Sequence, residues 1–184
     1  MLTRDEAINL LKANVKNRKI LLHMFAVEAI MRRLAQHLNE NEEVWGLAGL
    51  LHDIDYERTE GTPERHGVAA QQILKGRVPE EVLRAILSHN FEHTGVQPET
   101  SMEKALIASD AISGLLIACA LVMPSKKLSE VSLRTVKRKF KAKDFARGVS
   151  RERILFCEQI GIPREKFFEI SLEALKGIAP KLGL

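Results

Sequence analysis

The stretch Gly49-Leu50-Leu51-His52-Asp53-Ile54-Asp55 ends an apolar run, residues 44–51, with an imidazole and a carboxylate side by side. Burying that run carries His52 and Asp53 to the edge of the hydrophobic core. Both side chains are ligands suited to divalent ions such as iron, manganese and zinc. Adjacent His-Asp pairs occur by chance in many proteins, so the distribution of the other His and Asp residues decides what this pair means.

Composition predicts a helical, soluble protein. The 184 residues are 45% hydrophobic and 28% charged, as in ordinary globular domains. Aromatic residues make up 5%, and Leu, Ile, Ala, Glu, Lys and Arg dominate, which favours helices over sheets. Cys119 and Cys157 are too few for a disulfide framework, and the early acids Asp5 and Glu6 argue against a secretory signal. We therefore expect a cytoplasmic protein with reduced thiols.

Helix caps, apolar spacing and breakers predict the fold, an all-α, single-domain bundle of eight or nine helices. The helices are expected at about residues 3–14, 17–39, 42–53, 63–76, 79–89, 100–123, 129–139, 150–161 and 163–177. Residues 56–62 and 90–99 are expected to be loops. The run 105–123 is long enough to span a membrane, but Asp110 lies in its middle. We expect it to be a buried core helix without membrane contact.

Charge is unevenly distributed along the chain. The net charge is +4, yet residues 126–153 hold eleven basic and three acidic residues, which leaves −4 for the remainder. A basic segment suggests an anionic partner, although a solvated helix face is the plainer interpretation. We divide the chain into a metal-binding helical core, residues 1–125, and a basic helical extension, residues 126–184, that packs on it.

Histidines and one aspartate are placed in a way that favours a metal site. His23, His52, His66 and His89 lie at the ends or apolar faces of four different predicted helices. Asp110 lies in the middle of a fifth, on a face without a cation, and a buried carboxylate needs a partner. A metal ion would satisfy it, because helices packed ~8–10 Å apart can each aim one ligand at a shared centre. Taken singly, His23, His66 and His89 are each better explained as satisfied core histidines.

Five segments carry a resemblance to a known family. His23-Met24-Phe25-Ala26-Val27, Leu50-Leu51-His52-Asp53-Ile54 and Ala108-Ser109-Asp110 resemble the HD superfamily of metal-dependent phosphohydrolases, whose signature is a His, a downstream His-Asp pair and a later Asp. Arg65-His66-Gly67-Val68-Ala69 and Ile86-Leu87-Ser88-His89-Asn90 resemble the two extra histidine segments of its binuclear members. The resemblance covers roughly residues 17–120. It implies an all-helical fold, one or two divalent ions, and the metal ligands His23, His52, Asp53, His66, His89 and Asp110.

One position departs from the common signature, which reads His-Asp-Ile-Gly. Here Asp55 stands in place of the glycine, which leaves the subgroup open. We expect Asp55 to be a plain helix-end residue. The alternative is an acceptor for a ligating histidine.

The resemblance implies a phosphohydrolase, either a phosphomonoesterase or a phosphodiesterase. Its substrate would be a nucleotide or another small phosphate ester, attacked by a metal-bound hydroxide, with Asp53 as the bridging catalytic residue. The N/O ligand set leaves Fe, Mn, Ni, Co, Zn and Mg open as the metal. Arg65, His93 and Lys104 are candidate substrate contacts.

Two other functions stay open at this point. One is a diiron oxygenase, because a few HD-type proteins resemble this six-ligand set. The other is a non-catalytic module that binds nucleotides or nucleic acid through residues 126–153. The sequence does not predict an oligomeric state.

Overall fold

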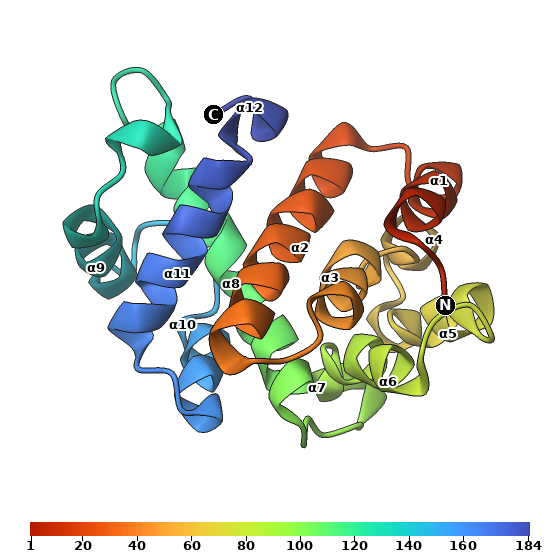
Figure 1. Ribbon diagram of the computed structural model, residues 1–184. Coiled ribbons are helices and arrows are strands. Elements are labelled where there is room, and N and C mark those ends of the chain that lie inside the picture. The colour runs from red at the N-terminus through yellow and green to blue at the C-terminus, as the bar shows by residue number, and fades with distance from the viewer.

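The computed structural model describes all 184 residues, and every regular element in it is a helix (Figure 1). The predicted all-α fold is confirmed. The α-helices are α1 (Arg4–Asn14), α2 (Arg18–Leu38), α3 (Glu42–Leu51), α4 (Tyr56–Thr59), α5 (Val68–Leu74), α6 (Glu80–Ser88), α7 (Phe91–Thr94), α8 (Ser101–Leu121), α9 (Leu133–Lys141), α10 (Arg151–Ile154), α11 (Arg164–Gly177) and α12 (Ala179–Leu182). Short 3-10 turns occupy Pro63–Arg65, Leu128–Glu130 and Leu155–Ile160.

All nine predicted helical segments contain helix, and three single-turn helices add to them. Two of these, α4 and α7, lie in segments predicted to be loops. In α4 the Asp55 carbonyl accepts from the N–H groups of Arg58 and Thr59, and in α7 the Asn90 carbonyl accepts from those of His93 and Thr94. A single turn has no hydrophobic period, so spacing arguments miss it.

The predicted helix 63–76 is broken near its start. Gly67 has a φ of 85°, a left-handed value that favours glycine, and separates the 3-10 turn from α5. His66 therefore sits at a bend between two short helices. At this bend the His66 side chain points toward His89, whose Nε2 lies 3.0 Å from His66 Nε2.

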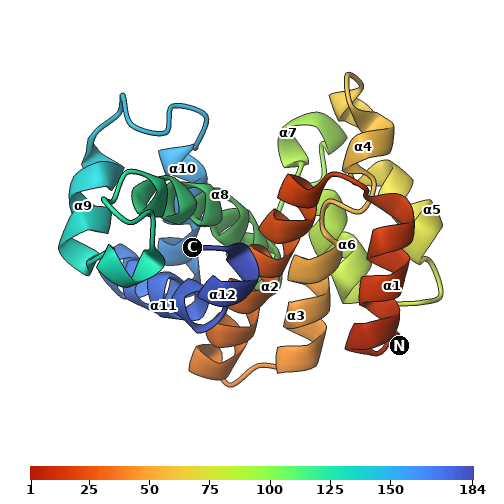
Figure 2. The same ribbon diagram turned by 90° about the horizontal axis from the view of Figure 1, so that it is seen from above.

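Two long helices, α2 and α8, form the middle of the molecule (Figures 1 and 2). Helices α1, α3, α5 and α6 lie on one side of them, and α9 to α12 lie on the other. A single hydrophobic core of 46 buried residues runs through both sides. Residues 126–184 contribute Val136, Phe167 and Leu175 to it, so they form a layer of the same core.

Helix α8 is the long apolar segment of the sequence. It is long and apolar enough to cross a membrane, and 61% of its most hydrophobic window is buried inside the protein. Leu106, Ile112 and Leu116 are fully buried. Packing in the core therefore accounts for its hydrophobicity, as the sequence predicted.

Helix α3 packs closely on α2 at Gly49. A Cβ at Gly49 would lie 2.9 Å from the Cα of Glu28 and from the carbonyl oxygen of Val27, which are backbone atoms of α2. Gly49→Ala must push the two helices apart, so we expect the free energy of unfolding to fall by about 1–3 kcal/mol in urea titrations.

The matched control is Gly177→Ala at the end of α11. A Cβ there meets nothing within 4 Å, so stability should hold or rise by roughly 0.5–1 kcal/mol. If Gly49→Ala were as stable as the wild type, the close approach of α2 and α3 would be contradicted.

Candidate metal centre

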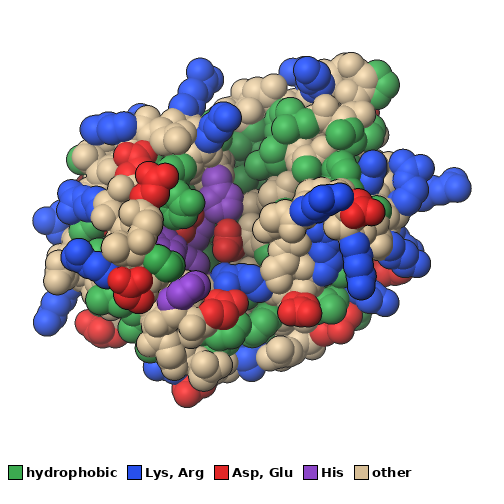
Figure 3. All heavy atoms as spheres, turned by 180° about the vertical axis from the view of Figure 1, so that it is seen from behind, with side chains coloured by type: hydrophobic (Ala, Val, Ile, Leu, Met, Phe, Trp, Pro, Cys, Tyr) green, Lys and Arg blue, Asp and Glu red, His purple; other side chains and the backbone are tan.

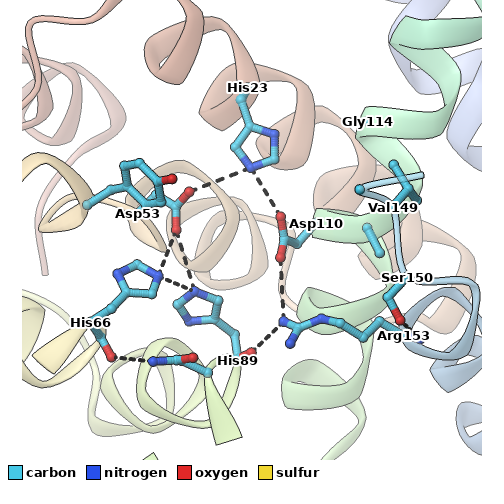
Figure 4. A pocket seen from close by; sticks show the side chains of 13 residues that line it. His23, Asp53, His66, His89, Asp110, Gly114, Val149, Ser150 and Arg153 are labelled. Carbon is cyan, nitrogen blue, oxygen red and sulfur yellow. Dashed lines mark hydrogen bonds and ion pairs between the residues drawn. The ribbon is translucent and has the colours of Figure 1, made fainter. Parts of the chain in front are cut away.

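The structure brings the six predicted ligands together, although they come from five separate parts of the chain. Five of them line one hollow (Figures 3 and 4), and the sixth, His52, is fully buried beside Asp53. Their positions follow from the helices. His23 lies in the second turn of α2, and Asp110 lies midway along α8. The others stand at helix ends, because the chain turns there and can aim a side chain inward: His52 and Asp53 after α3, His66 before α5, and His89 after α6.

Asp53 lies at the centre of the cluster. Its Oδ2 is 3.7 Å from His23 Nε2 and 3.4 Å from His52 Nε2. Its Oδ1 is 3.1 Å from His66 Nε2 and 3.5 Å from His89 Nε2. Each oxygen of one carboxylate therefore faces its own pair of imidazoles. Two groups able to hold a metal ion result, and they share Asp53.

Asp110 joins the first of these groups. Its Oδ1 is 3.2 Å from His23 Nε2 and 3.8 Å from His52 Nε2. Its Oδ2 lies 3.5 Å from the Arg153 guanidinium. The group around His23 and His52 therefore has two carboxylates, whereas the other group has only Asp53.

Backbone carbonyls orient two of the imidazoles. His52 Nδ1 lies 2.9 Å from the carbonyl oxygen of Gly49, and His89 Nδ1 lies against that of Ile86. A carbonyl can only accept, so each Nδ1 carries the proton and donates it. The lone pair of each neutral ring is then on Nε2, the atom that faces Asp53.

Side chains orient the other two imidazoles. Ser113 Oγ donates to the Asp110 carbonyl at 2.8 Å and lies 3.1 Å from His23 Nδ1, so it accepts a hydrogen bond from that ring. His66 Nδ1 donates to Asp55 Oδ1 at 3.0 Å. In each of the four rings, Nδ1 is therefore held by a partner outside the cluster and Nε2 faces Asp53.

Asp55 is more than a helix-end residue, so that expectation was wrong. Its side chain is fully buried, and its Oδ2 accepts from the backbone N–H groups of Gly67 at 2.8 Å and Ala70 at 2.9 Å. Its Oδ1 accepts from His66. A carboxylate at this position fixes both the start of α5 and the His66 ring, which is the role weighed as the alternative.

The converging nitrogens fit a bound cation. His23 Nε2 and His52 Nε2 are 3.2 Å apart, and His66 Nε2 and His89 Nε2 are 3.0 Å apart. Two lone pairs at such distances repel each other unless a proton or a metal ion lies between them. Imidazole nitrogens with carboxylate oxygens form a donor set for divalent transition metals.

Protonation of the cluster also suits metal binding. Burial lowers the pKa of His52 to about 4, which keeps it neutral. Burial also acts on His66, but Asp53 and Asp55 outweigh it and raise the pKa of His66 to about 10. Burial alone would raise the pKa of Asp110, yet the His23 imidazole lowers it to about 2. Asp110 is therefore ionised, and a metal ion would displace the extra proton on His66.

The cluster opens into a pocket of about 420 Å³. Its far side from the histidines is formed by Ala111 and Gly114 of α8 and by residues 148–150, which precede α10 (Figure 4). Arg153 is the one Lys or Arg that lines it. This cation comes from the basic segment 126–153, which the sequence placed outside the metal-binding core.

Arg65, His93 and Lys104 do not line this pocket, so the structure gives no support to them as substrate contacts. Arg65 is exposed and lines a separate hollow, because neighbouring residues of a turn point in different directions and His66 points inward. His93 is exposed on α7 and contacts only Asn90 among the pocket residues. Sequence reasoning missed Arg153, and its place within the basic segment was the one signal available.

Comparisons with known proteins agree with this geometry. A family model described as HD domain matches residues 20–115, a range that contains all six predicted ligands. Ribonuclease Y from Acholeplasma laidlawii (strain PG-8A) is 35% identical over 98 residues. That match covers 51% of this chain and 18% of the relative, so the chain spans less than a fifth of that protein. No solved structure matches the chain significantly. Since the family model matches more than half of the chain, the chain belongs to the HD domain family.

Proposed function

We propose that the protein is a metal-dependent phosphohydrolase acting on a nucleotide or another small phosphate ester. The observation that carries the proposal is the Asp53 carboxylate, which faces one histidine pair with each oxygen. Membership of the HD domain family supports it. Divalent ions bound there would lower the pKa of a water molecule and neutralise charge on phosphoryl oxygens.

Two sets of residues would hold these ions. Asp53 Oδ2 with His23, His52 and Asp110 forms one set, and Asp53 Oδ1 with His66 and His89 forms the other. Asp55 keeps the His66 ring turned toward the second set. The ligands are nitrogen and oxygen, so the proposal covers Fe, Mn, Ni, Co, Zn and Mg.

Arg153 would bind the phosphoryl group beside these residues. Its guanidinium is held by Glu92 at 2.9 Å and donates to the His89 carbonyl at 2.5 Å, so its position is fixed. A positive group held at the pocket stabilises negative charge that develops on phosphoryl oxygens. It fills the role considered for Arg65 and Lys104.

The substrate within this class is a further proposal. The name of the bacterial relative denotes a ribonuclease, and the basic segment 126–153 would attract an RNA backbone. An RNA phosphodiester is therefore a substrate to test beside small phosphate esters. We also propose a cytoplasmic location, because Cys119 and Cys157 are buried free thiols.

Asp53→Ala is the direct test of this function. Loss of the shared carboxylate should remove most of the bound metal and lower phosphate release by at least about 100-fold, since the charge-stabilising site collapses. Elemental analysis and a phosphate-release screen measure both effects. Asp144→Ala, at a side chain that is 94% exposed, is the matched control.

The same screen without oxygen separates hydrolysis from oxygenase chemistry, because hydrolysis needs no dioxygen. The proposal fails if Asp53→Ala retains its metals and full turnover, or if wild-type turnover stops under anaerobic conditions.

Arg153→Gln tests the cation. We expect kcat for phosphate ester hydrolysis to fall about 100-fold, as when one charge-stabilising donor is removed from an active site, with KM changed less. Lys104→Gln is the control, because Lys104 does not line the pocket, and its activity should match the wild type. Equal effects of the two variants would exclude Arg153 from the role proposed.

A further inference from the structure

Arg151 has an unusual set of partners. It forms no ion pair, and its guanidinium donates instead to six backbone carbonyls within residues 139–149. The acceptors are Phe140 at 3.2 Å from Nε, Ala146 and Val149 at 2.8 and 2.9 Å from Nη1, and Lys139, Ala142 and Phe145 at 3.2, 3.2 and 2.5 Å from Nη2.

These bonds add to the few backbone hydrogen bonds of the segment. Residues 142–150 lie between α9 and α10 and contain turns but no helix. The carbonyls of Ala142 and Ala146 also accept from the N–H groups of Phe145 and Val149, whereas the carbonyls of Phe145 and Val149 accept from no backbone N–H. Arg carries five N–H donors in a rigid plane, which lets one side chain serve several acceptors at once. Ala146, one of the acceptors, has a φ of 49°, a left-handed value that costs a non-glycine residue free energy. The guanidinium offsets that cost.

The segment that Arg151 organises reaches the metal centre. Gly148, Val149 and Ser150 line the pocket opposite the histidines, where Figure 4 shows Val149 and Ser150 beside Gly114 of α8. A Cβ at Gly114 would lie only 3.2 Å from Val149 Cγ2, so the segment and α8 nearly touch there. We refer to residues 148–150 as the pocket wall.

The pocket wall differs in chemistry from the rest of the pocket. It carries no charged side chain, and neither does the part of α8 that faces it, Ala111 and Gly114. The charged groups of the pocket are the metal-centre residues and Arg153. A phosphate ester held with its phosphoryl group at the charges would place its uncharged part against the wall.

We propose that Arg151 is a positioning residue that holds residues 142–150 in place, so that the pocket wall binds the uncharged part of the phosphate substrate. Arg151 contacts none of the six predicted ligands, so its effect on the reaction passes through substrate binding. Contacts to a part of the substrate that does not react change its affinity and leave kcat unchanged when they are equally strong in the ground state and in the transition state. That the ligand is a phosphate substrate rests on the proposed function. That Arg151 holds residues 142–150 in place does not.

The test compares Arg151→Lys with Arg147→Lys. Lysine keeps the charge but offers a single point of donation, so it cannot serve six carbonyls. Arg147 lies in the same segment, but its side chain is 78% exposed and contacts only Asp144. Ala111→Leu is a third variant, which fills the space before the wall and leaves Arg151 intact.

Trypsin gives a readout that needs no substrate, since the segment offers cleavage sites at Lys143 and at residue 147, which is basic in every variant compared. We expect cleavage there to be at least about tenfold faster in Arg151→Lys, because local opening exposes the sites. Arg147→Lys and Ala111→Leu should resist trypsin like the wild type. An unchanged rate in Arg151→Lys would overturn the positioning role.

Kinetics give the second readout, with adenosine 5′-monophosphate and methyl phosphate as probes. Arg151→Lys and Ala111→Leu should raise KM for the nucleotide about tenfold and leave kcat/KM for methyl phosphate within about twofold, because methyl phosphate has little to place against the wall. Metal content should stay at the wild-type value. Equal losses for both probes would overturn the proposal.

If wild-type protein hydrolyses neither probe, the phosphomonoesterase form of the proposed function fails. Calorimetric binding of adenosine 5′-monophosphate then decides the role of the wall. Weaker binding in both variants supports it, and unchanged binding overturns it.

Discussion

The rest of the structure depends on one constraint: four imidazole nitrogens and two carboxylates converge inside a helical bundle around Asp53. Such a cluster is unfavourable by itself, because lone pairs and like charges repel one another. It persists because α2, α3 and α8 are held by a shared core that does not involve the cluster. The core supplies stability that offsets the cost of bringing these groups together at the edge of a pocket.

Orientation of the rings is as important as their position. Each Nδ1 is fixed by a group outside the cluster, and Asp55 shows how far this reaches, because its carboxylate joins the His66 ring to the first turn of α5. A ring fixed in this way loses little freedom when its Nε2 takes a ligand, so binding costs less entropy. The same logic applies to Arg153, which Glu92 holds in place before any substrate arrives.

Much of the fold and the set of converging residues could be predicted from the sequence. Capping boxes and apolar spacing located nine helical segments. The resemblance to the HD superfamily predicted that the six residues from His23 to Asp110 named as ligands form one site. The contributions of Asp55, Arg151 and Arg153 were not predictable, because they depend on which groups the fold brings beside these side chains. Asp55 meets His66, 11 positions away, Arg153 meets His89, 64 positions away, and Arg151 meets carbonyls of an irregular segment that has no spacing pattern. The sequence predicted a basic surface for segment 126–153, because composition shows the charge of a segment. Composition does not show that two of its arginines, Arg151 and Arg153, point into the protein.

Central to the proposed function is the expectation that Asp53 would help to hold two divalent ions, one with His66 and His89 and one with His23 and His52. Crystals grown with Mn²⁺ and measured for anomalous scattering test it most directly. We expect two peaks in each chain, one beside Asp53 Oδ1 near His66 and His89, and one beside Oδ2 near His23 and His52. A chain that binds no manganese, or binds it without contact to Asp53, would contradict the account.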